Sequence, residues 1–177
     1  MGKQYKTLTD EDIEFIKQQK LFYLASSSKN EVNLAPKGYD SIRIIDDSSL
    51  VFMNYPGSGN RTYNDALNDG EFTLVFNAFE GSANIVRIFC KAKIIEAISE
   101  KFHKYLKLFN EKENLVRNFF EFNIYAVESS CGMSVPLMEY KGDRNSLKKW
   151  VVSMDKNDKL KEYNEQHLVP VNLRRLP

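Results

Sequence analysis

Short apolar runs separated by turn-forming residues occupy most of the chain before residue 130. Such runs, rich in Ile, Val, Leu, Phe and Tyr, are typical of strands with at least one buried face. The run at 85–95 alternates apolar and polar residues from Ile88 onward, which indicates a strand with one face in water. The pattern predicts strands at about residues 21–25, 32–35, 42–45, 50–53, 72–76, 85–95 and 120–127.

Helical periodicity is confined to segments around these strands. Thr9 can cap a helix, and the acidic residues after it complement the positive end of the helix dipole. Asp12 stands where a capping box usually has Glu or Gln, so the box is imperfect. Residues 99–110 place apolar side chains at helical spacing. The pattern predicts helices at about residues 9–19, 63–69 (ended by Gly70), 99–110, 145–154 and 158–166, a turn at 26–30 and an irregular segment at 131–142.

The number and spacing of the predicted strands favour a mainly β fold. Six or seven short strands with hairpin signals and peripheral helices are typical of a closed or partly open β-barrel. A doubly wound sheet would need a regular alternation of strands with longer helices. The 177 residues suit a single domain, 1–177, with a barrel core at about 8–155 and a helical C-terminal extension at about 156–177.

Composition excludes several functional classes. A formal net charge of +1 does not favour binding to nucleic acid or to an anionic membrane. The apolar runs are far shorter than the roughly 20 residues of a membrane-spanning helix, and the first residues lack the apolar core of a secretory signal. Cys90 and Cys131 are too few for a disulfide framework. We therefore expect a cytoplasmic protein with no nucleic-acid or membrane partner.

The loop at 57–62, Gly-Ser-Gly-Asn-Arg-Thr, carries groups that suit a phosphate. Its glycines let backbone N–H groups approach an anion closely, and Arg61 can make a bidentate contact to phosphate oxygens. The loop lacks the Gly-Lys-Ser/Thr ending of a Walker motif, and Thr62 replaces the third glycine of a dinucleotide fingerprint. An ordinary Gly/Ser turn with a surface arginine is the alternative interpretation.

A second segment, Pro36-Lys37-Gly38, ends the strand predicted just before it and is expected to lie near that loop. Lys37 can supply a second positive charge for a phosphate, or a donor to the ring of a planar cofactor. The alternative is a solvated turn lysine.

Other reactive side chains form no convincing constellation. His103 lies on a lysine-rich helix face, and with His167 it cannot complete a three-ligand zinc site. Nothing near Cys131 in sequence is positioned to lower its pKa. Arg87 and Lys91 share a polar strand face, which meets either ligand or water. No side chain stands out as a catalytic acid or base, so no catalytic residue is assigned.

Taken in order, these motifs resemble the pyridoxamine 5′-phosphate oxidase-like family of flavin-binding split barrels, and more narrowly an oxidase-like subfamily distinct from the vitamin B6 oxidase itself. The resemblance covers about residues 8–155. It implies a Greek-key split barrel, a homodimer, and FMN bound in clefts at the subunit interface. The stretches that carry it are APKGYD at 35–40, GSGNRT at 57–62, FNAFEG at 76–81, RIFC at 87–90 and SCGMSVPLMEYKGDR at 130–144.

The resemblance also implies roles for individual positions. In the family, basic and hydroxyl groups before a helix hold the FMN phosphate, and a strand matching 32–37 lies along the isoalloxazine ring. Two further positions match family residues whose backbone meets the flavin. The implied cofactor-binding residues are Ser58, Gly59, Asn60, Arg61 and Thr62 for the phosphate, Lys37 and Gly38 along the ring, and Met53 and Asn54 through their backbone.

Departures from the family pattern bear on the reaction. The vitamin B6 oxidase has an Arg-Lys pair where this chain has Asn60-Arg61, and neither Trp150 nor Arg174-Arg175 matches its C-terminal Trp/Arg pattern. The resemblance therefore implies an FMN-dependent oxidoreductase whose substrate and electron donor the sequence does not identify. The alternative is a non-catalytic protein that binds or stores a flavin, or haem.

Overall fold

The computed structural model describes residues 2–28 and 31–173. Its strands form one antiparallel sheet in the order β3-β2-β6-β7-β8-β5-β4, with β1 paired to β8. The prediction of a mainly β fold with peripheral helices is confirmed. The strands are β1 (Lys3–Tyr5), β2 (Phe22–Ser27), β3 (Val32–Lys37), β4 (Ile42–Asp46), β5 (Ser49–Asn54), β6 (Glu71–Asn77), β7 (Ile85–Ile95) and β8 (Asn118–Ser130).

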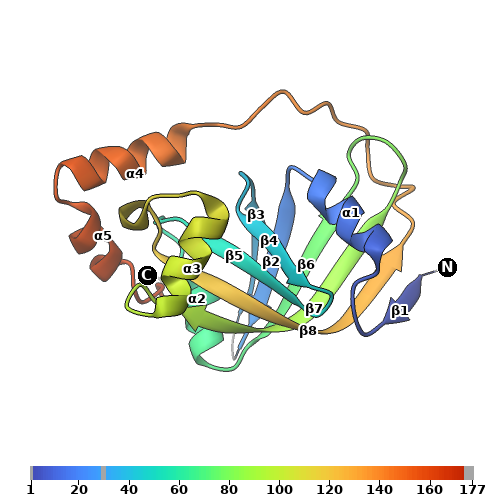
Figure 1. Cartoon of the computed structure of the whole chain (residues 1–177), viewed down its shortest axis with the longest axis horizontal. Coiled ribbons are helices and arrows are strands. Elements are labelled where there is room, and N and C mark those ends of the chain that lie inside the picture. The colour runs from blue at the N-terminus through green and yellow to red at the C-terminus, as the bar shows by residue number, and fades with distance from the viewer. Residues whose placement is uncertain (1, 29–30, 174–177) are drawn as a thin grey trace.

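The helices lie around the sheet, and α4 and α5 lie together at the end of the molecule opposite the N-terminus (Figure 1). No helix in the described part of the chain is long and apolar enough to cross a membrane. The helices are α1 (Asp10–Gln18), α2 (Arg61–Leu67), α3 (Glu100–Phe109), α4 (Ser146–Lys156) and α5 (Leu160–Gln166), with a 3₁₀ turn at Glu113–Leu115.

Three local predictions need correction. Residues 26 and 27 continue β2 rather than forming a turn, and residues 29 and 30 of that predicted turn lie outside the described residues. Helix α2 begins at Arg61, so the last two positions of the 57–62 loop belong to its first turn. The capping box of α1 is complete: the Thr9 hydroxyl accepts a hydrogen bond from the Asp12 N–H, and the Asp12 carboxylate accepts one from the Thr9 N–H.

Two hydrophobic clusters form the core. The larger one fills the barrel interior with residues such as Leu24, Leu74 and Phe122, all fully buried. The second lies where α3 packs on the opposite face of β5 and β8, as its helical periodicity predicted. Its residues are Val51, Met53, Tyr55, Ile95, Phe102, Tyr105, Leu106, Phe109, Val116 and Phe119.

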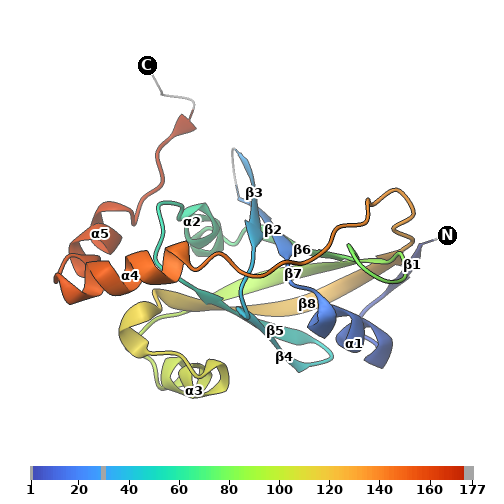
Figure 2. The ribbon, with the colours of Figure 1, turned by 90° about the horizontal axis from the view of Figure 1, so that it is seen from above.

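The segment between β8 and α4 runs along the molecule and returns the chain to the opposite end of the barrel (Figure 2). Its backbone is held by the β6–β7 turn: Met138 N–H donates to the Phe79 carbonyl at 3.0 Å, and Tyr140 N–H donates to Glu80 Oε1 at 3.0 Å. This path places α4 and α5 beside the loop that follows β5.

Candidate anion-binding site

Strand β3, which ends at Lys37, contacts the first turn of α2, where the 57–62 loop ends. Along β3, Asn33 and Lys37 share the more buried face, while Val32 and Leu34 point to solvent. Asn33 Nδ2 donates to the Thr62 hydroxyl, in the first turn of α2, at 3.2 Å. The inward face of β3 therefore carries Asn33 beside the first turn of α2, and Lys37 at the other end of the strand.

Lys37 is a half-buried cation with no counter-charge. Its ammonium nitrogen lies 5.6 Å from the centre of the Phe52 ring. Within residues 2–28 and 31–173 it makes no hydrogen bond and no ion pair. Burial, and then the positive charge of Arg117, lower the pKa of Lys37. Removing a charge from water without a partner is costly, so this position favours an incoming electron-rich group.

Arg117, which the sequence reasoning missed, is the second cation of the site. It stands immediately before β8, and its guanidinium donates to the Gly57 carbonyl at 2.8 Å and to Asn164 Oδ1 at 3.0 Å. A longer bond of 3.4 Å reaches Asn60 Oδ1. All three acceptors are neutral, and burial lowers the pKa of Arg117. The only signal in the sequence was a basic residue just before a predicted strand.

A buried amide donor lies on the next residue. Asn54 and Asn118 face each other across β5 and β8, and Asn54 Nδ2 donates to Asn118 Oδ1 at 2.9 Å. Asn118 is only 1% exposed, and its own Nδ2 has no partner within the described residues. Leaving a buried donor unpaired costs about 1–3 kcal/mol, and native proteins rarely tolerate this without a reason.

The loop between β5 and α2 presents an open surface. Ser58 and Gly59 are exposed, and a Cβ added at Gly57 or Gly59 would meet nothing within 4 Å. Packing therefore does not require either glycine. Asn60 is buried instead, with its Nδ2 donating to the Leu168 carbonyl at 2.8 Å.

Arg61 lies at the start of α2 and is already engaged. Its Nη2 donates to the Val171 carbonyl at 2.7 Å, and its Nη1 lies 3.6 Å from the Glu31 carboxylate. A ligand phosphate at this guanidinium would have to replace the Val171 contact or share the donors with it.

The two remaining predicted positions, Met53 and Gly38, make backbone hydrogen bonds to Ser41. The Met53 side chain is buried in the cluster under α3, and its N–H donates to the Ser41 carbonyl at 2.8 Å. Gly38 is exposed, and its carbonyl accepts from the Ser41 hydroxyl at 2.8 Å.

A cavity of about 820 Å³ adjoins Gly38. It lies between the end of α1, the end of β3 and the segment that follows β8. Both aromatic and charged residues line it. Its lining includes Tyr23, Tyr39, Phe79, Tyr140, Lys20 and Arg144.

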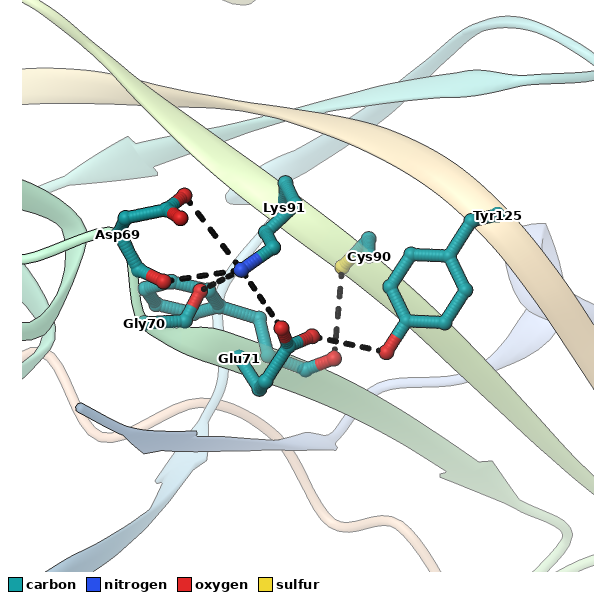
Figure 3. A network of polar contacts seen from close by, with 7 residues as sticks. Asp69, Gly70, Glu71, Cys90, Lys91 and Tyr125 are labelled. Carbon is teal, nitrogen blue, oxygen red and sulfur yellow. Dashed lines mark hydrogen bonds and ion pairs between the residues drawn. The ribbon is translucent and has the colours of Figure 1, made fainter. Parts of the chain in front are cut away.

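The polar face of β7 forms a self-contained network away from this site (Figure 3). Lys91 Nζ lies 2.6 Å from the Glu71 carboxylate and 3.4 Å from that of Asp69, and the Tyr125 hydroxyl donates to Glu71. Arg87 is likewise paired, at 3.1 Å from Glu128. These side chains neutralise one another, so the shared face predicted for Arg87 and Lys91 meets neighbouring charges.

Neither the cysteines nor the histidines contact the candidate cations Lys37 and Arg117 in the described part of the chain. Cys90 is buried next to the β7 network, and burial raises the pKa of its thiol. His103 is exposed on α3, while the His167 ring stacks on Tyr163 with 4.0 Å between centroids. Within the described residues no three His, Cys, Asp or Glu side chains are grouped to hold a metal ion.

No protein-family model matches the chain. Among curated proteins it is similar to the pyridoxamine 5′-phosphate oxidase family protein ustO of Aspergillus flavus, with 28% identity over 140 residues. The match covers 76% of this chain and 56% of the relative, so the chain spans just over half of that protein's length.

Solved structures share the fold at lower identity. A candidate pyridoxamine 5′-phosphate oxidase from Lactobacillus delbrueckii is 19% identical, with a TM-score of 0.55 over 70% of this chain and 98% of that one. HupZ from Group A Streptococcus is 19% identical, with a TM-score of 0.57 over 68% and 91%. An FMN-binding protein from Syntrophomonas wolfei is 18% identical, with a TM-score of 0.50 over 72% and 85%. The predicted split-barrel fold is confirmed.

Proposed function

We propose that this chain, which resembles pyridoxamine 5′-phosphate oxidase-like proteins in both sequence and fold, binds FMN and acts as an oxidoreductase. The observation that carries the proposal is the pair of half-buried cations, Lys37 and Arg117, which have no anionic partner within the described residues. Like charges in a partly desolvated place disfavour each other's charged state. A ligand that brings negative charge and ring carbonyl oxygens relieves that cost.

The residues present fit FMN in three respects. The surface above Gly57 and Gly59 is open to a phosphate, and Arg61 presents a guanidinium beside it. Lys37 lies on the inward face of β3, which the family resemblance aligns with the isoalloxazine ring. The unpaired Nδ2 of Asn118 supplies a further buried donor in the same region.

Within this proposal each group has a separate task. Arg61 and the loop at 58–60 bind the phosphate, and Lys37 donates to an acceptor on the flavin ring. Arg117 holds the loop in place through the Gly57 carbonyl and adds positive potential. Bound flavin supplies the redox chemistry, while the protein supplies binding and electrostatic tuning. The cavity beside Gly38 offers the substrate a place next to the ring.

The proposal includes a homodimer with FMN at the subunit interface. Strand β3 is the end strand in the sheet order. Its outward face carries Val32 and Leu34, which are 79% and 63% exposed. Apolar side chains on the outer face of an end strand are a liability unless something covers them. A second copy of the chain provides that cover and brings a second wall to the cleft.

The test is the absorbance spectrum of the purified protein, followed by titration with FMN, FAD and riboflavin. We expect flavin absorbance. We also expect the protein to bind FMN more tightly than riboflavin, because only FMN makes the phosphate contacts. Protein that is colourless and binds none of the three would refute the proposal. Reduction of the bound flavin by NAD(P)H, directly or through a partner reductase, would separate an oxidoreductase from a carrier.

A further inference from the structure

The last described segment of the chain contacts the end of the loop assigned to the phosphate, at Asn60 and Arg61. We call residues 167–172, which follow α5, the C-terminal strap. The Leu168 carbonyl accepts from Asn60 Nδ2 at 2.8 Å, and the Val171 carbonyl accepts from Arg61 Nη2 at 2.7 Å. Figure 2 shows the chain leaving α5 and passing beside α2. Two carbonyl oxygens of the strap therefore occupy donors that a phosphate oxygen would use.

The strap forms one wall of an open pocket at this position. A cavity of about 270 Å³ lies between it and the face formed by β3 and α2. That volume is several times the roughly 30 Å³ that one water occupies in the liquid, so the pocket has room for a group larger than a water molecule. The lining consists of Glu31, Asn33, Arg61, Asn64 and Asp65 on one side and Val169, Pro170, Val171 and Asn172 on the other.

The strap itself is weakly held by apolar packing. Val169 and Val171 are 77% and 64% exposed, so their side chains bury little surface against the barrel. Helix α5 is anchored separately, because Asn164 accepts two hydrogen bonds from Arg117, at 3.0 and 3.1 Å. The strap can therefore leave the loop while α5 stays in place, with the bend at His167.

We infer that the C-terminal strap is a lid over the phosphate loop, which a phosphate-bearing ligand displaces by taking the donors of Asn60 and Arg61. This inference rests on the proposed function, since the ligand is the one proposed there. A charge-assisted bond from a guanidinium to a phosphate is stronger than the same bond to a neutral carbonyl, which drives the exchange. Riboflavin has no phosphate and leaves the strap where it is.

The test compares the full chain with a variant that ends at Gln166 and so keeps α5 and Asn164. Flavin affinity and association rate are measured for FMN and for riboflavin. We expect the shortened chain to bind FMN at least fivefold more tightly and faster, with riboflavin binding unchanged. Thermal unfolding of both chains checks that the barrel is intact.

Limited proteolysis of the full chain provides a second measurement, which decides the question if the shortened chain does not fold. FMN is expected to increase cleavage within 168–172, and riboflavin to leave it unchanged. Weaker FMN binding by the shortened chain, or protection of the strap by FMN, would make the strap part of the site and overturn the lid. Equal FMN binding by both chains would contradict the lid and would leave the proposed function unaffected. Flavin binding by neither chain refutes both.

Discussion

At the scale of single residues, Lys37 links stability to ligand binding. A half-buried cation without a partner destabilises the ligand-free protein. We predict that Lys37→Met raises the melting temperature of the ligand-free protein. The same change weakens FMN and riboflavin alike, by about 1.5–3 kcal/mol or roughly tenfold to hundredfold, because Lys37 donates to the shared ring. Differential scanning calorimetry and flavin titration measure the two effects.

The matched control for this prediction is Lys91→Met. Lys91 is paired with Glu71 and Asp69 on the distant face of β7, so its loss should leave flavin binding unchanged. A Lys37→Met variant that loses stability and keeps its flavin affinity would contradict the role assigned to this lysine.

The lowered pKa of Lys37 also gives a pH dependence. Between its pKa in the folded protein and the usual value of 10.5, the unfolded chain holds the proton more tightly, so folding stability rises with pH. We predict that the stability advantage of Lys37→Met over the wild type shrinks as pH rises through this window. Urea unfolding of both proteins at several pH values checks this, because other titrating groups cancel in the difference. A difference in unfolding free energy between the two proteins that stays constant up to pH 10.5 would argue against a charged, unpaired Lys37.

Arg61 tests the phosphate assignment independently of the ring. We predict that Arg61→Ala weakens FMN by about 1.5–3 kcal/mol and leaves riboflavin binding nearly unchanged, because the lost contact is to the phosphate. The control is Arg87→Ala, which removes an arginine paired with Glu128 far from the loop. Equal losses for the two flavins, measured by fluorescence titration, would place Arg61 away from the phosphate.

At the scale of elements, the junction between α2 and β6 depends on one glycine. A Cβ at Gly70 would lie 2.8 Å from the Asp65 and Ser27 carbonyl oxygens, both backbone atoms. We predict that Gly70→Ala destabilises the protein by about 1–3 kcal/mol, because the helix must move off the sheet. Gly59→Ala is the control, since its Cβ enters open space. Chemical denaturation compares the two variants. Equal free energies of unfolding would show that the junction between α2 and β6 accommodates the extra Cβ without loss of stability.

Local sequence patterns were sufficient for most elements and insufficient for the contacts between them. The apolar stripe of α3 and the alternation in β7 follow from side-chain period alone, and the structure confirms both. Strand β1 was missed because Lys3–Tyr5 has no apolar alternation and pairs with β8, far along the chain. The sequence correctly places Gly70 after α2, although its role is close backbone contact rather than a left-handed turn.

At the scale of the whole molecule, the candidate site joins segments that are distant in sequence. The bond from Arg61 to Val171 spans 110 residues, and the bond from Arg117 to Asn164 spans 47. The local pattern of apolar and polar residues does not predict contacts between residues so far apart in the sequence. The ordered motifs indicate β3 and the loop after β5. Arg117 reaches that loop from the start of β8, and the C-terminal strap reaches it because the segment after β8 carries the chain back across the barrel (Figure 1).

The last prediction also concerns the whole molecule, namely its assembly into a homodimer. If a second copy covers the outward face of β3, a charge placed there must separate the subunits, because an unpaired charge in an apolar interface is costly. We predict that Leu34→Glu is monomeric at micromolar concentration and loses FMN, whereas the wild type is a dimer. Ile98→Glu is the control, since Ile98 is 96% exposed and lies off β3. Sedimentation velocity measures the state of each, and a wild-type monomer that binds FMN would contradict a site built at the interface.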